Sequence, residues 1–455
     1  MPGNLTFAAL KEAAANGTID TVVAVMVDMQ GRLLGKRFHV QNFIDTAFDE
    51  THCCNYLLAT DFEMATPDGY ASTSWSSGYG DYVMKPDMST LRITPWAEGA
   101  AMIFCDVQDH RTHADVPHSP RAILKHQIAR LAALGYTCTA ATELEFFVYR
   151  ETYEQAREKN YQSLTPISAY NEDYHIFQTA KEEGLMRPLR NQLYAAGVPV
   201  ECTKGEAESG QAELNIRYSD ALDMADTHSL AKHATKEIAW NTGYSVSFVA
   251  KPHEDTVGSS SHIHQSLRSA DAEPVFYDPD QPNGMSVIMQ QYLAGLLKYA
   301  SDTTVFLAPY INSYKRFAAG TFAPTRIVWS IDNRTAGYRI VAPASENVRV
   351  ECRVGGSDMN PYLAMAAQLA AGIAGIEQSL ELEDAFSGDA YAAGNATEIP
   401  GNLRDATQAL KASDMLRQAM GDDVVDHYVR AASWEQEEFD RIVTDYEIRR
   451  GFERS

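Results

Sequence analysis

The sequence predicts an α+β protein with two domains, a smaller one at residues 1–112 and a larger one at residues 113–455. Its 455 residues are enough for a large core and for more than one domain. A polar, proline-containing connector at 109–120 separates two patterns along the chain. Strand-like segments dominate before the connector, whereas strand and helix signals alternate after it.

The first domain has mainly strand character. Residues 20–40 predict two strands joined by a turn that contains a glycine. Residues 79–96 and 100–108 predict further short strands. The boundary near residue 112 follows because the connector comes directly after them.

The second domain mixes helices and strands. Residues 121–135 have a helical period that stops at a glycine, and residues 220–243 predict a longer helix. Strands are expected at 140–150 and 210–219. The most apolar run, 360–376, contains asparagine, proline and glutamine and is rich in small residues, so we interpret it as a buried core helix and not a membrane span.

Composition limits the classes of partner. The formal net charge of −23 argues against a nucleic-acid or anionic-membrane binder, whose contact surface would be basic. An anionic substrate must then be bound by a local group of arginines. Six cysteines form no paired C-x-x-C pattern and no disulfide framework, which favours a reducing compartment. The N-terminus has no basic stretch followed by an apolar one, so we expect a soluble cytoplasmic enzyme.

Acidic residues recur on strands where charge is costly. Glu143 and Glu145 are two apart, so both point to one face of their predicted strand. Glu206 and Glu213 bracket a Ser-Gly turn, as acids on two strands of a hairpin would. Each pattern alone also fits a solvated strand face. Because an apolar run follows Glu145, however, these acids must be paired or bound to metal.

The segment GSSSHIHQSL, 258–267, sets His262 and His264 on one face of an extended stretch. Such a pair can be a hydrogen-bonded strand pair, a metal-ligand set or part of a nucleotide site. Phosphate-binding loops of the G-x-x-x-x-G-K-[ST] and G-x-G-x-x-G types are absent from the sequence. A bound nucleotide would therefore need metals and arginines to hold its phosphates. Five late arginines meet this need: Arg316, Arg334, Arg339, Arg349 and Arg353.

Six segments taken in order resemble the glutamine synthetase family: ELEFF, GQAEL, GSSSHIHQSL, NSYKRF, DNRTAGYRI and VRVECRVGGSDMNPYLAMAA. The resemblance runs from the N-terminal strands to about residue 376. It implies a small β-grasp-like N-terminal domain and a catalytic domain with a curved antiparallel sheet and helices. It also implies a homo-dodecamer of two hexameric rings, with each active site between neighbouring subunits.

The resemblance also implies the metal ligands. Glu145, Glu206 and Glu213 resemble the ligands of one ion, either Mg²⁺ or Mn²⁺. Glu208 is an alternative to Glu206, which the family's spacing favours. Glu143, His262 and Glu351 resemble the ligands of a second ion.

The remaining positions resemble the contacts of ATP and glutamate. His264, Ser266 and Tyr218 resemble nucleotide contacts, with Tyr218 near the adenine. Gly258 resembles a backbone contact to the amino group of glutamate. Two arginines, Arg316 and Arg353, resemble its carboxylate clamps. Phosphate contacts are implied for Arg334, Arg339 and Arg349, with Arg334 in a catalytic role.

Two departures concern the nitrogen nucleophile. After NSYKR the family carries a flap glutamate that holds and deprotonates ammonium, but this chain has Phe322 there. DGYASTSW, 68–75, aligns with the family's ammonium-site aspartate at Asp68, with an alanine at position 71 where the family has a serine. An aromatic ring cannot accept a proton, but it offers an apolar surface to an organic amine.

The sequence therefore predicts a carbon–nitrogen ligase that phosphorylates the γ-carboxylate of glutamate with ATP and joins it to a primary amine. The nucleophile would be an alkylamine, ethanolamine or a polyamine. Two alternatives remain open: an ordinary glutamine synthetase that uses ammonium, and a non-catalytic member kept as a structural assembly. The complete set of metal-ligand positions argues against the latter.

Overall fold

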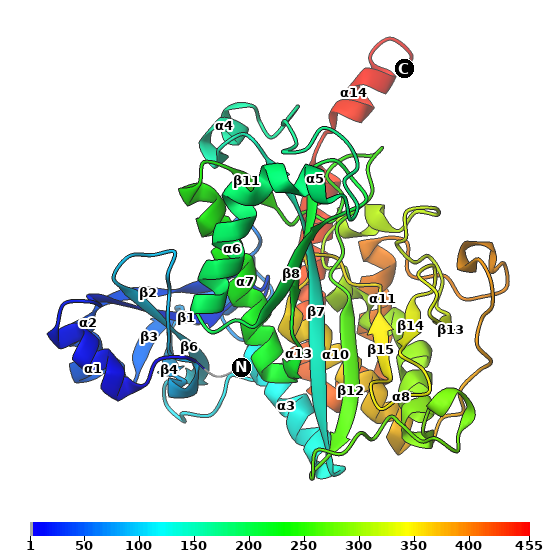
Figure 1. Ribbon diagram of the computed structural model, residues 1–455, viewed down its shortest axis with the longest axis horizontal. Coiled ribbons are helices and arrows are strands. Elements are labelled where there is room, and N and C mark those ends of the chain that lie inside the picture. Colours follow the sequence, from blue (N-terminus) through cyan, green and yellow to red (C-terminus); the bar gives the residue numbers. More distant parts are fainter. Residues whose placement is uncertain (1–2) are drawn as a thin grey trace.

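Figure 1 shows the computed structural model of the chain, which describes residues 3–455. It contains one sheet of six strands and one of nine, with most helices packed around the larger sheet. The α+β prediction is confirmed. No helix within residues 3–455 has both the length and the apolar character needed to cross a bilayer.

The first sheet has the order β2-β1-β6-β4-β3, with β5 beside β6. Its β1–β6 pair is parallel and the other pairs are antiparallel. The strands are β1 (Thr21–Val27), β2 (Leu33–His39), β3 (Thr51–Cys54), β4 (Asp81–Pro86), β5 (Arg92–Ile93) and β6 (Ala100–Asp109). The helices α1 (Phe7–Ala15), which is capped by the Thr6 side chain, and α2 (Val40–Asn42) accompany them.

Strand β1 is buried on both faces because two cores meet across it. Val22, Ala24 and Met26 pack into the core of the N-terminal part. Val23, Val25 and Val27 face the other way, into the core shared with the catalytic part. The predicted boundary near residue 112 falls between β6 and the next helix, and as a domain boundary it stays a prediction.

The second sheet has the order β13-β14-β15-β12-β7-β9-β8, with β10 and β11 also paired to β7. All pairs are antiparallel except β13–β14, which is a parallel departure from the expected pattern. Its strands are β7 (Tyr136–Tyr149), β8 (Val200–Gly205), β9 (Gln211–Ile216), β10 (Ser219–Asp220), β11 (Ser245–Ser247), β12 (Ile263–Ser269), β13 (Trp329–Ile331), β14 (Tyr338–Val341) and β15 (Arg349–Cys352).

Helices cover one face of this sheet, with α3 and α7 against the long central strand β7. The predicted core helix is present as α10, of which all but the last two residues are buried. The helices of this part are α3 (Pro120–Ala133), α4 (Tyr153–Glu158), α5 (Ile176–Thr179), α6 (Glu183–Ala195), α7 (Ala221–Asn241), α8 (Val287–Lys298), α9 (Ala300–Leu307), α10 (Pro361–Glu377), α11 (Leu403–Ala412), α12 (Asp414–Met420), α13 (Asp422–Arg441) and α14 (Asp445–Gly451).

Candidate active site

The face of the second sheet opposite its helices carries the predicted acids. Glu143 and Glu145 project from this face of β7, while Leu144 and Phe146 between and beside them are buried in the core. Glu213 of β9 lies directly across from Glu145 in the antiparallel register. The two-residue period therefore brings acids from separate strands together, as the sequence predicted.

The first cluster consists of Glu145, Glu206 and Glu213. One carboxylate oxygen from each lies within 4.8 Å of the others. Burial and the charge of Glu206 raise the pKa of Glu145 to about 7. Burial and the charges of the neighbouring acids raise the pKa of Glu213 to about 9. Three buried acids at this separation repel one another, so the cluster suits a divalent cation that prefers oxygen ligands.

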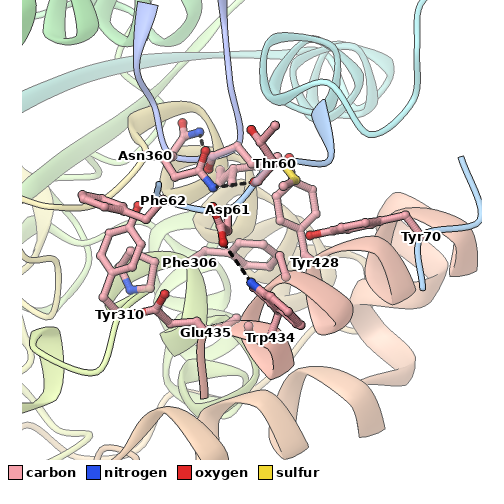
Figure 2. Close-up of a pocket in the computed structure, with 17 residues that line it drawn as sticks. Thr60, Asp61, Phe62, Tyr70, Phe306, Tyr310, Asn360, Tyr428, Trp434 and Glu435 are labelled. Carbon is pink, nitrogen blue, oxygen red and sulfur yellow. Dashed lines mark hydrogen bonds between the residues drawn. The ribbon is translucent and has the colours of Figure 1, made fainter. Parts of the chain in front are cut away.

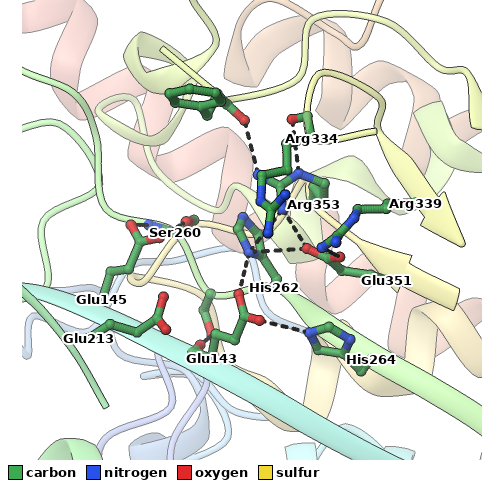
Figure 3. Close-up of polar contacts among 12 residues, drawn as sticks. Glu143, Glu145, Glu213, Ser260, His262, His264, Arg334, Arg339, Glu351 and Arg353 are labelled. Atoms are coloured by element: carbon green, nitrogen blue, oxygen red, sulfur yellow. Dashed lines mark hydrogen bonds and ion pairs between the residues drawn. The ribbon is translucent and has the colours of Figure 1, made fainter. Parts of the chain in front are cut away.

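The second cluster joins Glu143, Glu351 and the two histidines (Figure 3). His262 Nδ1 lies 2.6 Å from a Glu143 oxygen and 3.4 Å from a Glu351 oxygen. His264 Nε2 lies 3.0 Å from the other Glu143 oxygen. One ligand atom each from His264, Glu143 and Glu351 lies within 4.8 Å of the others. The direct distances nevertheless favour His262 as the ligand, because its Nδ1 lies close to both acids. His262 is our proposed ligand and His264 the alternative.

Arginines neutralise the second cluster. Glu351 is fully buried and accepts hydrogen bonds from Arg353 Nη1 at 2.5 Å and Arg339 Nη1 at 2.8 Å. Although burial opposes it, His262 and Arg353 hold the pKa of Glu351 below its usual value. Hydrogen bonds from His262 and His264 likewise hold the pKa of Glu143 well below its usual range, against the effect of burial. These acids are therefore ionised and able to bind a cation.

Gly258 and Arg316 form a tight wall beside the first cluster. A Cβ built on Gly258 would lie 2.4 Å from Arg316 Cγ, so no other residue fits there without a shift. Arg316 donates through Nη2 to the Val354 carbonyl, but its buried Nε has no hydrogen-bond partner among residues 3–455. Burial lowers the pKa of Arg316 to about 10. A buried, incompletely paired guanidinium is a natural partner for a substrate carboxylate.

Arg353 connects the second cluster to the loop that carries Phe322. Its Nε donates to the Arg334 carbonyl at 3.2 Å, and its Nη2 donates to the Phe322 carbonyl at 3.4 Å. Phe322 has a φ of 58°, a left-handed conformation that is uncommon for a bulky residue, and its side chain is 56% exposed. The Arg334 side chain is exposed, so it is free to contact a ligand.

Most of the residues predicted to bind phosphate and nucleotide lie on β12, β14 and β15. Arg339 also donates to Asp332, while Arg349 Nε donates to His264 Nδ1 at 3.4 Å. Ser266 Oγ donates to the Val348 carbonyl at 3.4 Å. Tyr218 is exposed and directly precedes β10, which pairs with the same end of β7 as Ser266 does. Tyr218 contacts none of the acids in the described contacts, and the roles of these residues in nucleotide binding stay predictions.

Asp68 is not brought to this region within a single chain. It lies in an exposed loop, where its backbone carbonyl accepts a hydrogen bond from Arg430 Nε of α13 at 2.7 Å. A place for Asp68 in the site therefore requires the predicted neighbouring subunit.

Four further residues support the acids. Ser260 donates to both oxygens of Glu145, from its N–H at 2.7 Å and its Oγ at 2.6 Å. Gln211 Nε2 also donates to Glu145 at 3.2 Å, and Lys204 forms an ion pair with Glu206. Asp332 pairs with Arg339. The sequence offered a signal for three of them, because Ser260, Gln211 and Asp332 lie within the segments GSSSHIHQSL, GQAEL and DNRTAGYRI. Lys204 lies outside these segments, two residues before Glu206.

The sequence pattern described as "Glutamine synthetase, catalytic domain" matches residues 117–451. The chain belongs to the glutamine synthetase family. Membership implies the use of ATP and a divalent metal, and the two acid clusters fit the metal.

The names of individual relatives are more specific than that of the family. The chain is 46% identical to the gamma-glutamylethanolamide synthetase of Streptomyces coelicolor, over 98% of this chain and 95% of the relative. It is 34% identical to the glutamate–isopropylamine ligase of a Pseudomonas species, over 95% of both chains. The solved structure "GmaS/ADP complex" superposes with a TM-score of 0.85 at 25% identity, covering 97% of this chain and 99% of that one. Both the family and the fold predicted from the sequence are thereby confirmed.

Proposed function

We propose that the protein is a γ-glutamylamide synthetase that joins glutamate to a small organic primary amine at the expense of ATP. The relatives named for ethanolamine and isopropylamine products support an organic amine. The observation that carries this choice is Phe322, whose carbonyl is held by Arg353 and whose ring is half exposed beside the proposed glutamate clamp. Ordinary glutamine synthetases place a carboxylate at that position.

The reaction has two steps. A γ-carboxylate oxygen of glutamate attacks the γ-phosphorus of ATP, the bond to the β,γ-bridging oxygen breaks, and ADP leaves. The amine nitrogen then attacks the acyl carbon, phosphate leaves with the acyl C–O bond electrons, and the nitrogen loses a proton. Bound divalent cations would neutralise the phosphates in the first step. Without phosphorylation the leaving group would be oxide, so the free carboxylate does not react.

The residues of this chain have separate roles in the proposed reaction. Arg316 and Arg353 bind the carboxylates of glutamate, and the backbone at Gly258 contacts its amino group. Arg334 meets the charge that develops on the moving phosphoryl group, which is where most catalysis of phosphoryl transfer lies. Phe322 provides an apolar wall for the alkyl group of the amine.

The metal ligands and the assembly are parts of the same proposal. Glu145, Glu206 and Glu213 would hold Mg²⁺ or Mn²⁺, and Glu143, His262 and Glu351 would hold a second ion. His264, Ser266, Tyr218, Arg339 and Arg349 contact the nucleotide. A cytoplasmic dodecamer would let Asp68 reach the site of the adjacent subunit, where it would take a proton from the ammonium form of the amine.

Phosphate release with glutamate, ATP and a panel of nucleophiles tests the function. We expect kcat/KM for at least one of ethylamine, propylamine and ethanolamine to exceed that for ammonium by about tenfold, since two methylenes buried against Phe322 contribute about 1.6 kcal/mol. If ammonium is the best nucleophile, the protein is an ordinary glutamine synthetase. If no nucleophile releases phosphate with Mg²⁺ or Mn²⁺ present, the ligase proposal fails.

A further inference from the structure

The loop that carries Phe322 is held by few contacts. The Phe322 carbonyl accepts a hydrogen bond from Arg353 at 3.4 Å, and the Phe322 N–H makes none within residues 3–455. Segment 58–70 is held more firmly, because Trp434 of α13 donates to Asp61 at 3.0 Å beside an aromatic cavity (Figure 2). The Phe322 loop therefore keeps a backbone donor without an acceptor, close to the proposed glutamate clamp.

The segment 388–399 brings Tyr391 to this loop. Side chains on either side of Arg334 bond to the first residues of the segment, at 2.8 and 3.0 Å. Its last three residues pair with the backbone of residues 325–327, which directly follow the Phe322 loop. The segment is thus fixed at one end beside Arg334 and at the other end beside the Phe322 loop.

The Tyr391 hydroxyl is buried and has no hydrogen-bond partner among the described residues. Burial raises its pKa, whereas the charge of Arg353 and the backbone N–H of Phe322 oppose this rise, so both groups lie near the hydroxyl. It is therefore neutral at pH 7, and its oxygen can accept a hydrogen bond. A buried hydroxyl and a backbone N–H that both lack partners cost free energy until they are paired.

We propose that Tyr391 is a positioning residue that fixes the Phe322 loop over the amine site. When the loop closes on bound glutamate, the Tyr391 oxygen accepts the Phe322 N–H while Arg353 holds the Phe322 carbonyl. Both peptide groups that flank Phe322 are then fixed, which maintains its left-handed backbone and presents the ring to the alkyl group of the amine. The contact itself follows from the structure alone, whereas its effect on the choice of amine rests on the proposed function.

Hydrogen exchange at the Phe322 amide tests the contact without turnover. The full-length protein is loaded with MgCl₂, glutamate and a non-hydrolysable ATP analogue, and fragmentation of the peptide isolates this amide. We expect the ligands to slow its exchange about fivefold in the wild type and less than about twofold in Tyr391→Phe, as the loss of one hydrogen bond predicts. Tyr338→Phe is the matched control, because it removes another buried hydroxyl without a described partner, from the core side of β14. It should exchange as the wild type does.

Phosphate release tests the effect on the amine. Tyr391→Phe should lower kcat/KM about fivefold for propylamine and less than about twofold for ammonium, which needs no apolar wall. The inference is overturned if the Phe322 amide exchanges alike in the wild type and Tyr391→Phe, or if Tyr338→Phe has the same effects. An unchanged ratio of propylamine to ammonium overturns the role of Tyr391 in amine choice. If the wild type prefers ammonium, the proposed function fails, and the exchange measurement still decides the contact.

Discussion

Binding of the first divalent cation should release protons, because two carboxyl groups of its cluster have raised pKa values. With a pKa of about 9, Glu213 is almost fully protonated at pH 7, and with a pKa of about 7, Glu145 is about half protonated. Metal ligands must be deprotonated, so about 1.5 protons should leave per ion bound at this cluster. The second cluster should release none from its acids, because Glu143 and Glu351 have lowered pKa values.

The sign of the pH effect follows from the raised values. Both carboxyl groups hold protons that compete with the metal, so affinity should rise with pH. The logarithm of the association constant should increase by about 1.5 per pH unit near pH 7 and level off above pH 9. Calorimetric titration of the metal-free protein with MnCl₂ in PIPES and in Tris measures the protons directly, because the two buffers differ in ionisation enthalpy.

Two variants test which residue releases the protons. Glu213→Gln should release about one proton fewer, because glutamine imitates the protonated acid, and should weaken the binding of Mn²⁺. Glu208→Gln is the matched control: Glu208 lies in the same hairpin, but it accepts N–H groups of Ser209 and Val257 instead of joining the cluster. Release of fewer than about 0.5 protons, or an affinity independent of pH between 6 and 8, would refute the reasoning.

Three other outcomes are expected. Phe322→Glu should lower the preference for propylamine over ammonium in phosphate release by about tenfold, the value of two methylenes; an unchanged preference would contradict the role of the ring. Arg353→Lys should raise the KM for glutamate about tenfold, because lysine keeps the positive charge but cannot bind a carboxylate through two parallel N–H groups. A rise in the KM for ATP alone would contradict the proposed role of Arg353 in binding glutamate. Burial and Glu172 raise the pKa of Glu182 to about 9, so the stability from its protonated form is lost as pH rises from 4.5 towards 9. Glu182→Gln should therefore reduce the loss of Tm between pH 5 and pH 9 by about 2 °C, and an unchanged loss would contradict the raised pKa of Glu182.

The strand period made much of the site predictable. Because side chains alternate, the spacing of Glu143 and Glu145 placed both on one face, and the structure adds Glu213 through the antiparallel register. The core helix α10 was equally clear, since its apolar run is long and is interrupted only near its start and at one glutamine.

Long-range contacts were not predictable, because a local pattern gives a face but no partner. The pair between Trp434 and Asp61 joins residues 373 apart. The place of Asp68 against Arg430 depends on packing between the two ends of the chain. The helix α1 was not predicted, although FAALKEAAA is rich in helix-forming residues and follows Thr6, a residue type that often caps helices.

The cross-strand pairing of Glu145 with Glu213, and of His264 with Glu351, limits how this protein can change. A single inserted or deleted residue within β7 would turn every following side chain to the opposite face. Phe146 would then point to solvent and Glu145 into the helices, so folding and chemistry would fail together. Divergence within the family should therefore proceed by substitution along these strands, and changes in length should collect in the loops that connect them.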